Sequence, residues 1–128
     1  MAKIPSEIVE NIDALKPFPV ATASPEGKPN LIYVSFLRVL DEETLELADN
    51  FFYKTRNNLD ANPVMSVTFW GEAIDDCYQI KGTVDVETEG PLYEDCADWV
   101  QSVNEDMTPK AAAVLHVEEI YSGKERLA

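Results

Sequence analysis

The sequence has few basic residues and no long apolar run. Ten Lys and Arg stand against 24 Asp and Glu, which gives a formal net charge of −14. Because polyanion binding needs a clustered basic surface and the basic residues here are scattered, we expect no nucleic-acid partner. The same charge argues against docking on anionic membranes. No segment reaches the roughly eighteen continuous apolar residues of a membrane span, and the first residues lack the apolar run of a signal peptide.

Cysteine is also scarce. The two residues present, Cys77 and Cys96, form neither a CxxC pair nor any familiar metal-ligand spacing. We interpret both as free thiols in a reducing compartment and therefore expect a cytoplasmic protein.

Catalytic motifs are mostly missing. The one histidine, His116, has no serine or carboxylate signature beside it in the sequence, so no triad or zinc site is predicted and a structural role is expected. No GxSxG, GxGxxG or Walker-type loop occurs. The acidic runs at 41–43 and 75–76 lie in predicted turns, where adjacent carboxylates are usually solvated, and we assign them no acid–base role.

The composition is that of an ordinary folded domain. With 128 residues, of which 45% are hydrophobic, the chain is long enough to bury one core. We therefore predict a single domain over residues 1–128.

Hydrophobic periodicity and turn residues predict six strands and three helices. The predicted strands cover residues 18–23, 30–40, 44–48, 64–70, 77–87 and 111–121. The predicted helices cover residues 6–16, 54–61 and 92–103. Short strands separated by turns, with helices outside them, favour a mainly β fold, an antiparallel barrel decorated by short helices. The alternative is a two-layer α+β sheet.

Apolar side chains occupy both faces of the strand predicted at residues 30–40. One face carries Leu31, Tyr33, Leu37 and Val39, and the other carries Ile32, Val34, Phe36 and Leu40. A small barrel covers only the inward face of its strands, so this strand predicts that a second subunit covers the outer face.

The segment at residues 50–59 has the most chemical content, because a strand there is predicted to lead into a helix. Free backbone N–H groups and the positive end of the helix dipole meet at such a start. Lys54 adds a charge and Thr55 adds a hydroxyl, a combination that suits a phosphate monoester. Alternatively, Thr55 is an ordinary helix cap and Lys54 and Arg56 are solvated surface charges.

Short motifs over most of the chain occur in a jointly specific order and spacing. They are Ala21-Thr22, Gly27-Lys28-Pro29-Asn30, Arg38-Val39-Leu40-Asp41, Leu47-Ala48-Asp49-Asn50, Lys54-Thr55, Asn58-Leu59, Asn62-Pro63, Tyr78-Gln79-Ile80-Lys81-Gly82-Thr83, Glu89-Gly90-Pro91, Lys110-Ala111-Ala112 and Val117-Glu118-Glu119-Ile120-Tyr121. In this pattern the sequence resembles the FMN-binding split barrel family, the small flavin nucleotide-binding proteins related to pyridoxamine 5'-phosphate oxidase.

The resemblance implies a six-stranded split β-barrel that forms a homodimer with two FMN sites between its subunits. Carried over to this sequence, it implies that Lys54 and Thr55 hold the FMN phosphate and that Asn58 supports the loop. The residues implied along the ribityl chain and the ring are Tyr33, Val34, Ser35 and the backbone near Asp49 and Asn50.

For three residues the sequence allows two interpretations. Tyr33 is equally expected as a core or interface aromatic, because large aromatic side chains dominate buried contacts. Gln79 and Lys81 could reach the cofactor or face water, and we favour water for Lys81.

Two departures from the family narrow the expected function. Pyridoxamine phosphate oxidases are longer and carry a C-terminal basic segment for the substrate phosphate, whereas residues 123–126 here are short and terminal, so vitamin B6 oxidation is not expected. In some small members an aromatic residue before the last strand covers the flavin. Residues 107–110 here are Met-Thr-Pro-Lys, so we expect a more exposed ring.

The function implied is therefore a flavoprotein in which FMN supplies the redox chemistry, as an oxidoreductase or an electron carrier. A small substrate or a basic redox protein would be its partner. The alternatives are a non-catalytic module that binds flavin or haem, and a structural dimer that has lost its ligand.

Overall fold

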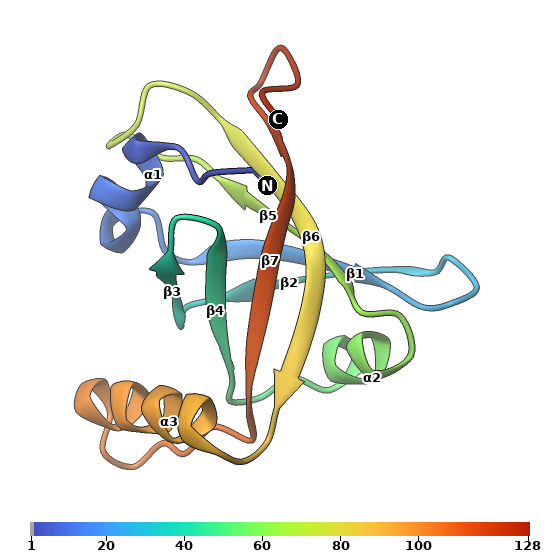
Figure 1. The fold of residues 1–128 in the computed structure, drawn as a ribbon, viewed down its shortest axis with the longest axis vertical. Coiled ribbons are helices and arrows are strands. Elements are labelled where there is room, and N and C mark those ends of the chain that lie inside the picture. The colour runs from blue at the N-terminus through green and yellow to red at the C-terminus, as the bar shows by residue number, and fades with distance from the viewer. Residues whose placement is uncertain (1) are drawn as a thin grey trace.

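Across residues 2–128, which the computed structural model describes, seven strands form one antiparallel sheet in the order β2-β1-β5-β6-β7-β4-β3 (Figure 1). The strands are β1 (Phe18–Ala23), β2 (Pro29–Val34), β3 (Leu37–Asp41), β4 (Thr44–Asp49), β5 (Val64–Phe69), β6 (Tyr78–Glu87) and β7 (Ala111–Tyr121). The helices are α1 (Ser6–Asn11), extended by the 3-10 turn η1 (Ile12–Ala14), α2 (Lys54–Ala61) and α3 (Pro91–Val103).

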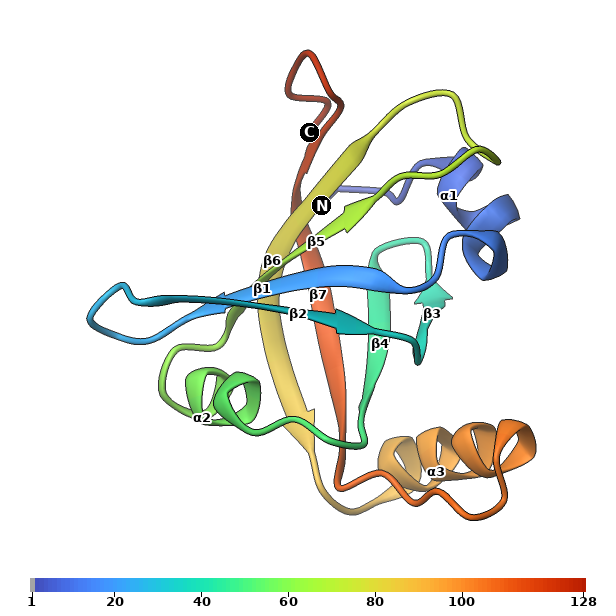
Figure 2. The ribbon, with the colours of Figure 1, turned by 180° about the vertical axis from the view of Figure 1, so that it is seen from behind.

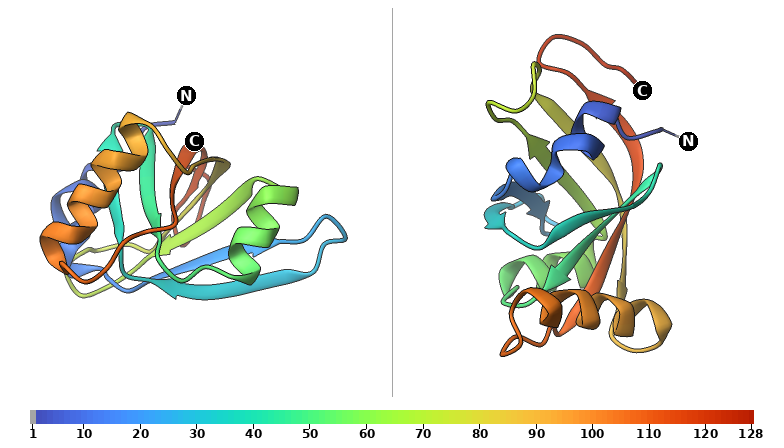
Figure 3. Two further views of the ribbon diagram at one scale, coloured as in Figure 1. Left: turned by 90° about the horizontal axis from the view of Figure 1, so that it is seen from below. Right: turned by 90° about the vertical axis from the view of Figure 1, so that its left-hand side faces the viewer.

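The connection between the two edge strands makes the sheet curl. β2 and β3 lie at opposite edges, yet only Ser35 and Phe36 separate them in the chain. The edges must therefore approach each other at this corner, and the sheet bends into an incompletely closed barrel (Figure 3). The predicted fold class, mainly β with an antiparallel split barrel and short peripheral helices, is confirmed.

The prediction of six strands is wrong, because the segment at 30–40 is two strands. At the corner the chain turns so that Val34 and Leu37 are both buried, which breaks the two-residue alternation of a continuous strand. On the outer face of β2, Leu31 and Tyr33 are 70% and 75% exposed. Within residues 2–128 of one chain, no segment covers this outer face, where the sequence predicts contact with a second subunit.

The main core fills the inside of the curled sheet. Phe18 of β1 and Phe69 of β5 meet edge to face with ring centroids 5.6 Å apart. Ile8 of α1 and Leu15 pack into the same cluster, which places α1 over one end of the sheet. α3 lies toward the other end (Figure 3), where Cys96 and Val100 pack on Ala48 of β4.

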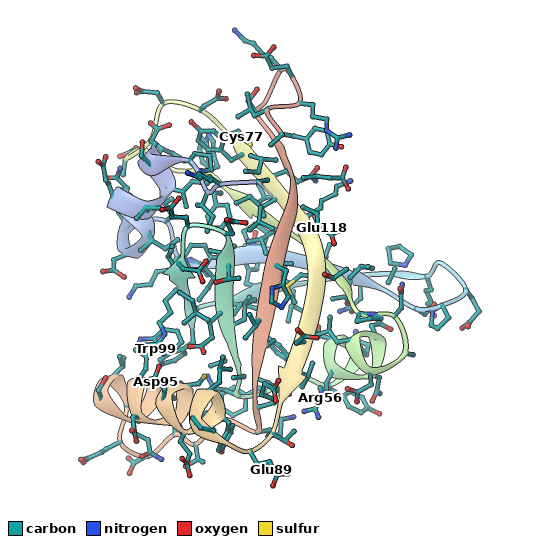
Figure 4. All side chains as sticks on the ribbon, viewed as in Figure 1. Arg56, Cys77, Glu89, Asp95, Trp99 and Glu118 are labelled. Carbon is teal, nitrogen blue, oxygen red and sulfur yellow. The ribbon has the colours of Figure 1, made fainter. Side chains whose placement is uncertain are left out.

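A buried carboxylate links α3 to the sheet. Glu46 of β4 is fully buried, and its Oε1 accepts a 2.8 Å hydrogen bond from Nε of Arg38 on β3. Arg38 also donates to Asp95 on α3 at 2.7 Å, and its guanidinium lies 4.4 Å from the centre of the Trp99 ring. Asp95 and Trp99 project from α3 toward this part of the sheet (Figure 4). Burial raises the pKa of Glu46 above its ordinary value, opposed by Arg38.

Burial also raises the pKa of the neighbouring Cys96 thiol to about 12. Both cysteines are free thiols, as the sequence predicted. Among residues 2–128, no helix has the length and apolar character needed to cross a bilayer.

The raised pKa of Glu46 predicts a pH dependence of stability. A group whose pKa is higher in the folded than in the unfolded chain stabilises most below its unfolded pKa, and this contribution is lost as pH rises through the folded value. Wild type should therefore lose stability relative to Glu46→Gln as pH rises from about 4.5. Urea unfolding of both proteins across this range measures the difference. The exposed carboxylate Glu87, changed to Gln, is the control, and a pH-independent difference for Glu46→Gln would contradict the prediction.

Candidate functional site

The connection from β4 to α2 is held by one buried carboxylate. Asp49, the last residue of β4, is 1% exposed. Its Oδ1 accepts the backbone N–H of Phe52 at 2.9 Å, and its Oδ2 accepts Nη1 of Arg56 at 3.2 Å. Nζ of Lys110 lies 3.7 Å from Oδ1. The conformation of residues 50–53 is therefore fixed from the strand, from the helix and from the segment before β7.

Lys110 attaches that last segment to the connection through two further bonds. Its backbone N–H donates to the carbonyl of Asp49 at 2.7 Å, and Nζ donates to the carbonyl of Phe52 at 2.6 Å. Met107, three residues earlier, is consequently placed beside the end of β4.

A cavity of about 380 Å³ lies against this connection. It is lined by Ile32, Tyr33, Val34, Ser35, Phe36, Ala48, Asn50, Phe51, Phe52 and Met107. The lining is mainly apolar and aromatic, with the hydroxyl of Ser35 and the amide of Asn50 as polar exceptions. Tyr33 and Phe51 are 75% and 80% exposed, so aromatic side chains border a cavity open to solvent.

The start of α2 follows directly on the cavity wall, since Lys54 comes two residues after Phe52. Thr55 is 2% exposed, and its Oγ1 accepts a 3.0 Å hydrogen bond from Nδ2 of Asn30 at the start of β2. One turn later, Nδ2 of Asn58 donates to Oγ1 of Thr22 on β1 at 3.1 Å. These bonds dock α2 on the β1–β2 hairpin, beside which it lies in Figure 2.

The alternative interpretation made Thr55 a helix cap and Lys54 and Arg56 solvated surface charges. It is wrong for Thr55 and for Arg56. The residue that caps α2 is Tyr53, without a side-chain capping bond, so Thr55 is not a helix cap. Arg56 is half-buried and pairs with Asp49 at 3.2 Å and with Asp60 at 3.1 Å. Lys54 is exposed and makes no ion pair within the described part of the chain.

The residues implied by the resemblance fall into three groups. Tyr33, Val34, Ser35 and Asn50 line the cavity. Asp49 lies behind the cavity wall. The remaining three, Lys54, Thr55 and Asn58, lie on α2 and do not line it.

Sequence reasoning did not identify Met107 as a cavity residue or Lys110 as the anchor of the β4–α2 connection. Nor did it identify Asn30 as a partner of Thr55, although Asn30 stands in one of the motifs. The contact of Asn30 with Thr55 spans 25 positions of the sequence, and that of Lys110 with Phe52 spans 58. No local pattern therefore signals them.

Other polar residues lie away from the cavity. His116 of β7 pairs with Asp85 of β6, Nε2 to Oδ2 2.8 Å, so its carboxylate partner comes from the adjacent strand. Lys81 is exposed, as expected, with Nζ 5.6 Å from the centre of the Tyr121 ring. Gln79 is half-buried and does not line the cavity. The described residues contain no group of three or more His, Cys, Asp or Glu placed to hold a metal ion.

Comparison with known protein families gives matches along nearly the whole chain. A family model described as pyridoxamine 5'-phosphate oxidase matches residues 4–123. An uncharacterized protein of Methanocaldococcus jannaschii is 33% identical over 126 residues, which span 97% of this chain and 83% of that protein.

Solved structures share the fold. HupZ from Group A Streptococcus superposes with a TM-score of 0.84 at 29% identity, covering 98% of each chain. An FMN-binding protein from Syntrophomonas wolfei gives 0.76 at 15% identity, covering 93% of this chain and 88% of that one. HutZ, the haem storage protein from Vibrio cholerae, gives 0.69 at 17% identity, with 94% of each chain covered. At such low identity the last two similarities show the fold alone.

The contacts of Asp49 predict that it stabilises the protein more than Asp60, the other carboxylate that pairs with Arg56. Asp49→Ala leaves the N–H of Phe52 without its acceptor, which costs about 1–3 kcal/mol in the free energy of unfolding. Asp49→Asn keeps an acceptor oxygen and should lose less. Asp60→Ala removes the other, exposed partner of Arg56 and should change stability by less than about 0.5 kcal/mol. Urea unfolding compares the three variants, and equal losses for Asp49→Ala and Asp60→Ala would refute this role.

Proposed function

The chain belongs to the pyridoxamine 5'-phosphate oxidase family, and from this premise we propose that it binds FMN and works as an electron carrier or oxidoreductase. The observation that carries the proposal is that residues 50–52 line a mainly apolar cavity and lead, one residue later, into the start of α2. FMN has a flat, largely apolar ring at one end and a phosphate at the other. The cavity suits the ring, and the start of α2 suits the phosphate. Bound FMN would supply the redox chemistry, and the protein would bind and orient it.

The cavity suits the ring end. Tyr33, Val34 and Ser35 from β2 and Asn50 from the β4–α2 connection border it, and Phe52 and Met107 add apolar surface. Aromatic and apolar walls with a few polar groups are typical of cofactor cavities. Ser35 and Asn50 offer hydrogen-bonding groups for the polar edge of a flavin.

The start of α2 suits the phosphate end. The first backbone N–H groups of a helix have no partner within it, and the helix dipole favours an anion there. Lys54 adds the cation and Thr55 the hydroxyl, while Asn58 holds the helix to β1. Arg56 contributes least, because Asp49 and Asp60 already engage it.

A second copy of the chain would complete the site. Leu31 and Tyr33 on the outer face of β2, with Phe51 and Tyr53 on the β4–α2 connection, are each at least 70% exposed. Exposed apolar side chains grouped beside a cavity are typical of an interface. We therefore propose a homodimer whose partner subunit covers this face and shares the FMN site.

The redox partner and the location follow from charge and thiol chemistry. A formal net charge of −14 favours a basic redox protein, or a small substrate, over an acidic partner. Free thiols suit a reducing compartment, so we propose the cytoplasm.

Haem is the second candidate ligand. The apolar cavity contains the thioether of Met107, a group that can ligate haem iron, and HutZ shares the fold. Against haem, His116 lies outside the cavity and pairs with Asp85. The start of α2, with Lys54 and Thr55, suits a phosphate, and haem has none. FMN is thus the better supported ligand.

Removal of the exposed cation at the start of α2 should weaken FMN binding. Purified wild type titrated with FMN should show shifted flavin bands and quenched fluorescence, with Lys54→Ala weaker by about tenfold, or about 1.4 kcal/mol. Riboflavin, which lacks the phosphate, should bind both proteins equally.

Lys28→Ala, which removes an exposed lysine in the β1–β2 turn, is the matched control and should bind FMN like wild type. Wild type that ignores FMN but develops a haem absorption band on titration would favour the haem alternative. A protein that binds neither ligand would indicate a structural dimer.

A further inference from the structure

A small polar cluster lies behind the start of α2. Thr22 of β1 and Asn30 of β2 are directly paired across the hairpin, and each is bonded to one residue of the helix. Nδ2 of Asn30 donates to Oγ1 of Thr55 at 3.0 Å, and Nδ2 of Asn58 donates to Oγ1 of Thr22 at 3.1 Å. Both threonines are at most 5% exposed, whereas both asparagines are half-buried, so these bonds are partly shielded from water.

The direction of the first bond determines what the Thr55 hydroxyl can do. A hydroxyl has one hydrogen to donate and lone pairs to accept. Because the Asn30 amide donates to the oxygen of Thr55, the hydroxyl hydrogen is not used in this bond, and no described residue accepts it. A buried donor without an acceptor is costly, so this hydrogen suits a ligand atom that accepts hydrogen bonds.

A phosphate monoester is such a ligand, since its ionised oxygens accept hydrogen bonds and do not donate. We propose that Asn30 is a positioning residue that makes Thr55 a hydrogen-bond donor toward the phosphate of FMN. Asn30 itself does not touch the ligand. This inference rests on the proposed function and adds to it the source of selectivity for the phosphorylated flavin.

A purely structural role for Asn30 would be to hold α2 on the hairpin. Asn62 provides the matched control, because its Nδ2 donates to the carbonyl of Ala23 at 3.1 Å and so joins the same two parts of the fold. This bond lies at the opposite end of α2 from Thr55. Loss of docking alone should therefore affect Asn30 and Asn62 variants alike, whereas loss of phosphate recognition should affect only Asn30 variants.

The test measures dissociation constants for FMN and riboflavin, together with urea unfolding, for wild type, Asn30→Ala, Asn30→Asp and Asn62→Ala. Asn30→Asp should weaken FMN binding by more than about tenfold, because its carboxylate accepts the Thr55 hydrogen and repels the phosphate. Asn30→Ala should weaken it by about threefold to tenfold. Riboflavin affinity should stay within about twofold for both, and Asn62→Ala should not change the ratio of the two affinities.

A double-mutant cycle keeps the test independent of folding defects in one variant. In a Thr55→Val background, Asn30→Ala should cause no further loss of FMN affinity, because the hydroxyl that it positions is gone. Additive losses, or parallel losses for FMN and riboflavin that track unfolding, would overturn the inference. If Lys54→Ala impairs FMN binding while Asn30 variants bind normally, only the role of Asn30 fails. If wild type does not bind FMN, the proposed function fails with it.

Discussion

Asp49 ends β4 with its carboxylate buried, and groups from three segments converge on it: the N–H of Phe52, the guanidinium of Arg56 and the ammonium of Lys110. Burial of a charge is unfavourable unless it is paired and hydrogen-bonded, and these partners meet that requirement. The same contacts fix residues 50–53, of which residues 50–52 form one wall of the cavity and residue 53 leads into α2. The shape of the cavity and the position of the helix start therefore depend on one carboxylate.

The two ends of the candidate site have different origins in the fold. The curl of the sheet creates the cavity, because the two-residue corner after β2 brings Tyr33, Val34 and Ser35 beside the end of β4. The start of α2 is placed by polar contacts with the β1–β2 hairpin, which Asn30 and Asn58 make. β2 participates in both, with its first residues behind the helix and its last residues in the cavity. A ligand that spans the site would thus contact surfaces organised by a single strand.

Local signals account for what the sequence could predict. α2 and β7 begin and end where predicted, because Asn62-Pro63 stops the helix and a mostly apolar run marks the strand. The corner at Ser35 contains neither glycine nor proline, so the sequence of residues 30–40 predicts one continuous strand. Family resemblance supplied Tyr33, Val34, Ser35 and Asn50, which share the cavity, but Lys110 and Met107 required the three-dimensional fold. Their positions depend on strand register, which no short window of sequence contains.

α2 has little apolar packing of its own. It has eight residues, of which only Thr55 and Leu59 are buried, and amide hydrogen bonds attach it to the hairpin. Helices of this length are marginal in isolation, and segments with few apolar contacts open locally at low free-energy cost. An anion that bridges the first turn would suppress such opening. Part of the intrinsic affinity would then be consumed in ordering the helix, and hydrogen exchange at residues 54–61 would report how fully the protein is loaded.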